Sequence, residues 1–231
     1  MQKAGWCSTS PYQEKEKLKL FFLAGLCLGA SSKSGPYQGK AQKIPGTLQC
    51  AFYDLGGEGV AYHDNDAKNN GSGGLNKADG TYLNEFRMNE GVDISYTKFH
   101  DEVDNHAFNK VMPPKDQLYV GWTEPGEWFN LSVQVAKAGN YDVELLYTSN
   151  QGGSISFDLD GKKLGASIEI ISTNDPKDPV AWRQWHHWNR MTLGEFELPK
   201  GRHRLTLRVE EKGNMNFATL EFQPSKAPKK P

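Results

Sequence analysis

Residues 128–135 read WFNLSVQV, a segment in which apolar and polar side chains alternate after the initial tryptophan. The apolar positions are Phe129, Leu131, Val133 and Val135. Successive side chains of a β-strand point to opposite faces of its sheet. The segment is therefore predicted to be a strand with one buried face and one face in water.

The same alternation returns downstream, at 141–147, 155–159 and 204–209, with turn residues at 138–140 and 160–161. Between 191–193 and 196–198 the apolar positions change phase, which predicts a β-bulge near Gly194 and Glu195. No helical stripe is found after residue 33. Short strands at steady spacing predict an all-β domain, either a sandwich or a barrel. Loop-rich stretches at 56–83, 98–117 and 172–181 are where binding residues are expected.

The N-terminal region has a different composition. Residues 18–30, LKLFFLAGLCLGA, form an apolar run accompanied by lysines and followed by small residues, the pattern of a secretory signal. A buried helix is the alternative. The run is shorter than the roughly 20 apolar residues of a membrane span, so no integral membrane domain is expected. We expect a signal peptide at 1–32, a linker at 33–45, a β-sandwich module at 46–223 and a disordered tail at 224–231. The protein would then be secreted, periplasmic or on the cell surface.

Cysteine and charge content exclude several classes of protein. After cleavage near Ser32, Cys50 is the one cysteine left, so no disulfide framework is expected. The formal net charge is −1 with acids and bases interspersed, whereas a nucleic-acid partner calls for a basic face. The sequence carries no nucleophile-elbow, zinc-protease or phosphate-loop motif, and we expect no enzyme activity. His186 and His187 are expected on opposite faces of a strand, which disfavours a shared metal ion.

Three tryptophans, Trp182, Trp185 and Trp188, occur in one short polar stretch. Strand alternation makes it improbable that all three are buried, so we expect one of them to be exposed. The C–H face of a sugar ring packs well on an exposed aromatic ring, because its positive hydrogens meet the negative π face. Flanking polar side chains would then hydrogen-bond the hydroxyl groups.

Several stretches, in order along the chain, together resemble carbohydrate-binding module family 6, whose fold is a galactose-binding-like jelly-roll β-sandwich. The resembling stretches are IPGT at 44–47, GGEGVAYHD at 56–64, Arg87 with EGVDI at 90–94, YVGW at 119–122, GEW at 126–128, AGNY at 138–141, LPKG at 198–201, and the segment from Asn216 to Phe222. The resemblance implies a jelly-roll sandwich of two antiparallel sheets. It also implies a site in the loops at one edge, where two aromatic rings grip a sugar and an asparagine binds its hydroxyls.

Carried over residue by residue, the resemblance implies a ligand-binding set of Phe86, Arg87, Trp185 and Asn216. Phe86 stands where the family usually has tyrosine. Trp188 would be a core residue, although a register with Trp182 and Trp185 as the tryptophan pair stays open. Trp122 and Trp128 would also be core, and Glu127 structural.

The resemblance implies non-catalytic binding of a plant or algal polysaccharide or its oligosaccharides, and leaves open an association with glycoside hydrolases. Two alternatives stay open: a glycoside hydrolase or lyase built on a β-sandwich, and a cell-surface adhesion or assembly protein. A long insert at 95–117 departs from the family pattern. It would wall the binding edge, contact a partner or pack over the sandwich, and its acids and histidines could hold a cation.

The family's structural calcium site is expected to be lost or weak, and no metal or other cofactor is expected. The usual glutamate of the first strand is replaced by Ala51, and a second carboxylate position is Ala218. A methyl group cannot ligate a hard cation that takes oxygen ligands.

Calcium is therefore predicted not to raise the melting temperature strongly, because a ligand stabilises a protein only when it binds the folded state. Thermal melting with added calcium and then with a chelator measures this. A strong upward shift that the chelator reverses would contradict the prediction.

Overall fold

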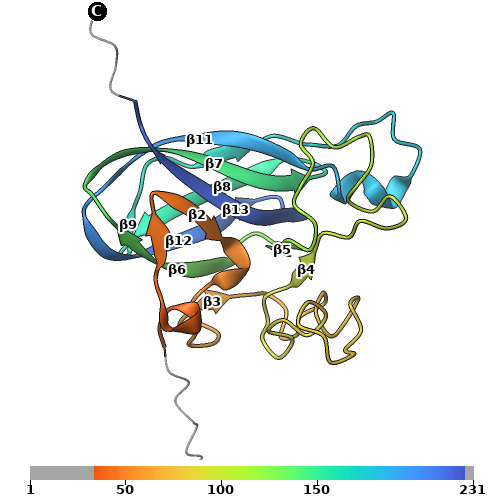
Figure 1. Ribbon diagram of the computed structural model, residues 1–231, viewed down its shortest axis with the longest axis horizontal. Helices are drawn as coiled ribbons and strands as arrows, with labels where there is room; N and C mark the ends of the chain where they lie inside the picture. The colour runs from red at the N-terminus through yellow and green to blue at the C-terminus, as the bar shows by residue number, and fades with distance from the viewer. Residues whose placement is uncertain (1–33, 227–231) are drawn as a thin grey trace, which may run out of the picture. The chain divides into compact units, whose positions relative to one another are not determined.

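The computed structural model describes residues 34–226 and shows a β-sandwich (Figure 1). The signal peptide expected at 1–32 and residues 227–231 of the expected tail lie outside the described residues. No helix among residues 34–226 is long and apolar enough to cross a membrane. The strands are β1 (Gln42–Ile44), β2 (Gly46–Gln49), β3 (Tyr62–His63), β4 (Ile94–Tyr96), β5 (Leu118–Val120), β6 (Trp128–Val135), β7 (Gly139–Ser149), β8 (Gly153–Leu159), β9 (Lys162–Lys163), β10 (Ile168–Ile170), β11 (Asn189–Leu198), β12 (Gly201–Glu211) and β13 (Met215–Pro224). The 3₁₀ helices are η1 (Tyr37–Gly39), η2 (Cys50–Phe52) and η3 (Ala181–Trp185).

The strands form two sheets that pack face to face as a jelly-roll sandwich, as the sequence predicts. One sheet has the order β1-β6-β12-β8-β10, with β3 paired to β6 and β9 to β8. The other has the order β11-β7-β13-β5-β4, with β2 paired to β13. Pairing is antiparallel except for β1, which runs parallel to β6 with Gln42 opposite Val133. The two antiparallel sheets expected from the resemblance are thus present, with β1 as a parallel edge strand.

The core lies between the two sheets and follows the alternation seen in the sequence. Leu131 and Val133 of β6 have no exposed surface. Rings from both layers meet at Phe196 of β11, which contacts Phe157 at 5.2 Å and Phe222 at 6.2 Å between ring centroids. Edge-to-face aromatic pairs of this kind are favourable beyond the area they bury. The sandwich is thus closed by apolar packing between the layers.

The predicted β-bulge is confirmed at β11. Its register with β7 shifts between Thr192 and Gly194, and Gly194 adopts a φ of 120°. A bulge places two residues of one strand opposite one residue of its partner. This is why the apolar side chains before and after it occupy positions of opposite phase.

The ends of the module lie further out than the sequence suggested. The stretch expected as a linker contains η1 and β1, and Ile44 is only 1% exposed. At the other end β13 includes Pro224, and the amide of Ser225 donates to the carbonyl oxygen of Asn140 at 2.9 Å. Hydrophobic alternation alone could not locate these ends, because β1 is short and pairs on one side only.

Carboxyl groups gather where the loop after β3 meets the loops that follow β5 and precede β4. We call Asp64, Asp66, Asp93, Glu124 and Glu127 the acidic cluster. Backbone and amide N–H groups hold it together: the carboxylate of Glu127 accepts from the amides of Asn65 (3.2 Å) and Glu124 (2.8 Å). The side-chain amide of Asn70 donates to Asp66 (2.7 Å) and to Asp93 (3.2 Å). The expectation that Glu127 is structural is confirmed.

Burial makes the charged form of these acids unfavourable, and the neighbouring carboxylates add repulsion. Burial is the main cause that raises the pKa of Asp64 to about 7 and of Glu127 to about 8, from ordinary values of 3.8 and 4.5. Burial also raises the pKa of Asp93. In the folded protein Asp64 and Glu127 therefore keep a proton at a pH where the unfolded chain has released it.

The free energy of unfolding is predicted to fall as the pH rises from about 5 to about 8.5. The stabilising contribution of a raised carboxyl pKa is complete below its unfolded value and is lost as the pH passes through 7 and 8. Urea unfolding across this range, with chelator present, measures the slope. Asp64→Asn and Glu127→Gln should flatten it, whereas Asp101→Asn, at a side chain 90% exposed, should leave it unchanged. Equal slopes in all four proteins would contradict the prediction.

Candidate functional site

A pocket of about 450 Å³ opens at one edge of the sandwich, where η3 lies near the ends of β5 and β13. We call it the aromatic pocket. It is lined by Leu75, Tyr119, Trp122, Trp182, Trp185, His186, Asn214 and Asn216. Its lining thus combines three tryptophans with two side-chain amides and one imidazole.

Both exposed tryptophans of residues 34–226 line this pocket, together with the exposed Leu75. Trp182 is 49% exposed, Trp122 is 37% exposed and Leu75 is 69% exposed, whereas Trp185 is half-buried. Large apolar side chains in water are unfavourable, and a group of them in one concave place is characteristic of a binding site. The prediction that one tryptophan of the 182–188 stretch is exposed is met by Trp182.

Backbone geometry brings Trp122 and Asn216 together. Trp122 has a φ of 50°, in the left-handed region, directly after Gly121 at the end of β5. A Cβ atom on Gly121 would lie 2.6 Å from Oδ1 of Asn216. Only glycine permits this close approach. The pair Gly121–Trp122 therefore turns the indole towards the pocket and leaves room for the asparagine.

The amide of Asn216 is oriented by the protein. Its Nδ2 donates one proton to Oγ1 of Thr148 at 2.8 Å and one to the carbonyl oxygen of Trp185 at 2.9 Å. That carbonyl also accepts from Oγ1 of Thr148 at 2.7 Å. A side-chain amide has two N–H donors, so Oδ1 is the atom left to accept a hydrogen bond from a ligand.

The structure brings together two of the four residues expected to bind the ligand, Trp185 and Asn216, and adds Trp182 and Trp122 to them. Trp188 is fully buried beside Tyr119, at 5.3 Å between ring centroids, which confirms it as a core residue. The expectation that Trp122 is core is wrong. The sequence signal was present, since Trp122 follows a glycine just beyond a strand end.

Phe86 lies elsewhere and is 3% exposed. Its ring packs against Tyr82 (5.2 Å), Tyr37 (5.5 Å) and Phe52 (5.8 Å). A ring covered in this way has no free face for a sugar. The expectation that Phe86 is a stacking platform is therefore corrected: in this structure it is a packing residue beneath η1 and η2.

Arg87 is also outside the aromatic pocket, and its side chain is 5% exposed. The guanidinium donates to both carboxylate oxygens of Glu90 (2.9 and 2.8 Å), to the carbonyl oxygen of Asp54 (2.8 Å) and to that of Tyr53. It also lies over the Tyr53 ring. All of these contacts tie the loop after η2 to residues 87–90. Arg87 therefore has a structural role in place of the ligand contact expected for it.

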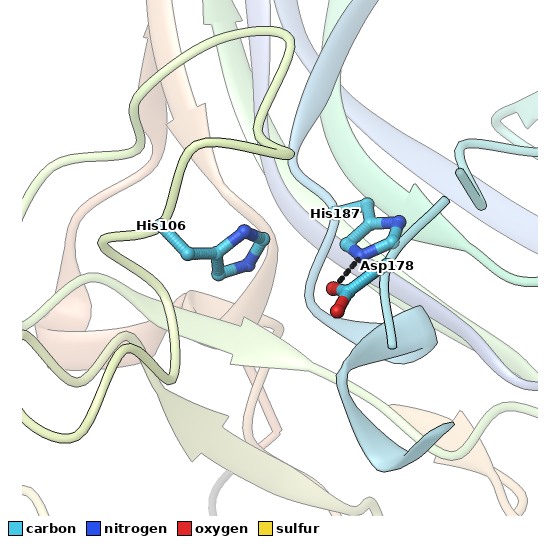
Figure 2. Close-up of side chains that lie close together, drawn as sticks. All are labelled: His106, Asp178 and His187. Atoms are coloured by element: carbon cyan, nitrogen blue, oxygen red, sulfur yellow. Dashed lines mark hydrogen bonds and ion pairs between the residues drawn. The ribbon is translucent and has the colours of Figure 1, made fainter. Parts of the chain in front are cut away.

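A cluster of His106, Asp178 and His187 has the composition of a metal site (Figure 2). Its hydrogen bonds argue against one. Nδ1 of His187 accepts the amide proton of Asp175 (2.9 Å), so its Nε2 carries the proton that is donated to Asp178 (2.7 Å). Nδ1 of His106 likewise accepts the amide proton of Phe108 (3.2 Å), and its Nε2 donates to the carbonyl oxygen of His186 (3.2 Å). A metal ligand needs an unprotonated ring nitrogen, and all four nitrogens are already engaged.

Asp178 is neutralised by a second partner. Arg183 donates to its two oxygens at 2.7 and 2.8 Å, and these bonds hold the pKa of Asp178 well below its ordinary value. Arg183 also reaches Glu102 of the insert at 3.0 Å. The cluster is thus a buried hydrogen-bonded joint between the insert and the η3 loop. His186 and His187 lie between η3 and β11, so the expectation that they occupy opposite faces of a strand is wrong. Their rings contact different carboxylates, Asp104 and Asp178.

No protein-family model matches the chain, and no curated protein matches it in sequence. Among solved structures it is similar to CsCBM6-3 of Clostridium stercorarium in complex with cellobiose, at 13% identity over 81% of this chain and 99% of that chain, with a TM-score of 0.48. It is similar to a β-1,3-glucan binding CBM6 of Bacillus halodurans at 14% identity over 80% and 99% of the two chains, with a TM-score of 0.48. The carbohydrate-binding module CBM6cm-2 of Cellvibrio mixtus lichenase 5A, in complex with cellotriose, is 22% identical over 47% and 79%, with a TM-score of 0.39. At these values the likeness concerns the shape of the fold and assigns no ligand to this chain.

Arg87→Ala is predicted to lower the free energy of unfolding by about 3 kcal/mol, because it removes the cationic partner of Glu90 and the donor to two buried carbonyl groups. Ligand affinity of the folded variant should stay at the wild-type value. Urea unfolding and calorimetric titration with an oligosaccharide measure the two quantities. Arg202→Ala, at an exposed arginine, is the matched control and should change stability by less than about 0.5 kcal/mol. Lost affinity with unchanged stability would contradict the structural role.

Proposed function

We propose that this protein is a non-catalytic carbohydrate-binding module that holds a neutral polysaccharide, or its oligosaccharides, in the aromatic pocket. The observation that carries the proposal is the meeting of exposed indole rings, Trp122 and Trp182, with the oriented amide of Asn216 in one pocket. A pyranose ring has an apolar C–H face and a rim of hydroxyl groups. It is therefore matched by aromatic faces that bear a few fixed polar atoms.

The charge of the pocket favours a neutral glycan. Among the lining residues none is lysine, arginine, aspartate or glutamate, and His186 is the one titratable group apart from the Tyr119 phenol. A uronate or sulfated sugar would have no cation to pair with inside the pocket. Desolvating its charge without a partner would cost more than stacking returns. Neutral plant or algal polysaccharides are the ligands that fit this uncharged lining.

The same lining supports binding without catalysis. Glycoside cleavage uses two carboxyl groups on either side of the scissile bond. No carboxylate lines the aromatic pocket. The carboxyl groups near it, such as Asp104 and Asp178, are engaged with histidine, tryptophan or arginine side chains. Binding by stacking and a few hydrogen bonds in one shallow site corresponds to a dissociation constant on the order of micromolar to millimolar.

The location of the protein forms part of the proposal. The apolar run at 18–30 and its lysines support secretion, with the binding module beginning after it. A secreted, periplasmic or cell-surface module of this kind would act on extracellular polysaccharide, and association with glycoside hydrolases would bring their active sites to the same polymer. The ordered resemblance to carbohydrate-binding module family 6 agrees with this assignment.

Trp182→Ala and Trp122→Ala are each predicted to weaken binding by about 5- to 150-fold, which corresponds to the loss of about 1–3 kcal/mol of stacking. Isothermal calorimetry with cellotetraose, laminaritetraose and xylotetraose measures the loss. Tyr82→Ala removes an aromatic ring that is 56% exposed outside the pocket and should bind as the wild type does. Wild-type affinity in both tryptophan variants would overturn the assigned site. Absence of binding to every neutral glycan of a wider array would overturn the function.

A further inference from the structure

A buried carboxylate of the 95–117 insert, that of Asp104, contacts a histidine that lines the aromatic pocket, His186. Asp104 has no exposed surface. Its Oδ1 accepts from Nε1 of Trp188 at 2.6 Å and is 2.9 Å from Nδ1 of His186, and its Oδ2 accepts the amide proton of Lys98 at 2.7 Å. The insert therefore does more than cover the sandwich, because it supplies the hydrogen-bond partner of a pocket residue.

These contacts decide where the proton of His186 sits. The indole N–H of Trp188 and the backbone N–H of Lys98 can only donate, so both oxygens of Asp104 act as acceptors. Nδ1 of His186 must then be the protonated nitrogen. In the neutral imidazole this leaves Nε2 with a lone pair and no proton. Nε2 makes no hydrogen bond within residues 34–226, and the side chain lines the pocket with 20% of its surface exposed.

The backbone around His186 is also held by the insert. The carbonyl oxygen of His186 accepts from His106, and the carbonyl of Trp188 accepts from the amides of Lys110 (2.9 Å) and Val111 (3.1 Å). The amide of Trp188 donates to Oδ1 of Asn109 at 2.9 Å. On the pocket side, the Trp182 ring meets the imidazole edge to face at 5.8 Å. The orientation of the ring is thus set before a ligand arrives.

We propose that His186, held by Asp104, is a specificity-determining residue of the pocket, and that its Nε2 accepts a hydrogen bond from a ligand hydroxyl. This inference rests on the proposed carbohydrate binding. Nε2 of His186 and Oδ1 of Asn216 are then two fixed hydrogen-bond acceptors. They require a ligand that donates two hydrogen bonds. The site selects a neutral sugar whose hydroxyls at these positions are free, and it discriminates against forms that are acetylated or methylated there. Asp104 is a positioning residue, since it acts through the imidazole.

Nuclear magnetic resonance of the ring nitrogens tests this without any mutation. The protein is labelled with ¹⁵N-histidine, and the signals of His186 are identified by their loss in His186→Gln. The expected spectrum of the neutral imidazole has a protonated Nδ1 and an unprotonated Nε2. The probe is whichever of cellotetraose, laminaritetraose and xylotetraose binds the wild type most tightly. Saturation with it should shift the Nε2 resonance of His186 and leave those of His203, on β12, unchanged.

Variants give the size of the effect. His186→Ala should weaken binding of the same tetrasaccharide by about 2- to 10-fold, the loss of one neutral hydrogen bond. His186→Asn places its amide near the Nδ1 position, so its affinity should fall as much as that of His186→Ala. His186→Gln places an oxygen near the Nε2 position and should recover part of the affinity.

The outcomes separate the two proposals. If the wild type binds and Trp182→Ala does not, while the Nε2 resonance is unmoved and His186→Ala binds normally, the role of His186 is overturned and the binding function stands. A neutral imidazole with its proton on Nε2 in the free protein overturns the tautomer and the inference with it. If the wild type binds no neutral glycan, the proposed function and the inference fall together.

Discussion

Each long strand buries one face against the opposite sheet, and this two-layer burial is the constraint on which the rest of the structure depends. Leu131 of β6, Leu145 of β7 and Leu207 of β12 have essentially no exposed surface. Because the two sheets fill both layers, the connecting segments leave the sandwich at its edges. The aromatic pocket lies at such an edge, and loops, a short 3₁₀ helix and the ends of β5 and β13 provide its walls. A rigid sandwich thus holds side chains that no single segment could orient.

Hydrogen bonds to main-chain carbonyls connect these loops to the sandwich. The carbonyl oxygen of Trp185 accepts from Thr148 on β7 and from Asn216 on β13, so η3 is fixed to the sheet at the residue that enters the pocket. From the insert, Nε2 of His106 donates to the carbonyl oxygen of His186, and the carboxylate of Asp104 accepts from the imidazole of His186. Side chains held in place before a ligand arrives lose less conformational freedom on binding. This would matter for the proposed function, in which a few stacked rings supply the attraction.

The charged groups are separated from the apolar ones. Acids collect in the acidic cluster, where burial raises the pKa of Asp64 and Glu127, and in the joint between the insert and η3, where Arg183 neutralises Asp178. The lining of the aromatic pocket contains no lysine, arginine, aspartate or glutamate, and its one imidazole is that of His186. This lining is the basis for proposing a ligand that carries hydroxyl groups and no formal charge. His106, Asp178 and His187 have the composition of a metal site but form a hydrogen-bonded cluster. The ring nitrogens of both histidines are already engaged in hydrogen bonds.

The sequence by itself determined the two-sheet sandwich and the bulge at Gly194, because period-two burial is a local property that can be read along one strand. Through an ordered resemblance it also predicted Trp185 and Asn216 as ligand-binding residues, and both line the aromatic pocket. It could not show that β1 runs parallel to β6, since three residues carry too little pattern. Only the tertiary structure decided that Trp122 is exposed in the pocket and that Phe86 is buried. Whether a ring is free to meet a ligand depends on which distant segments cover it, and that depends on three-dimensional packing, which alternation along a single strand does not record.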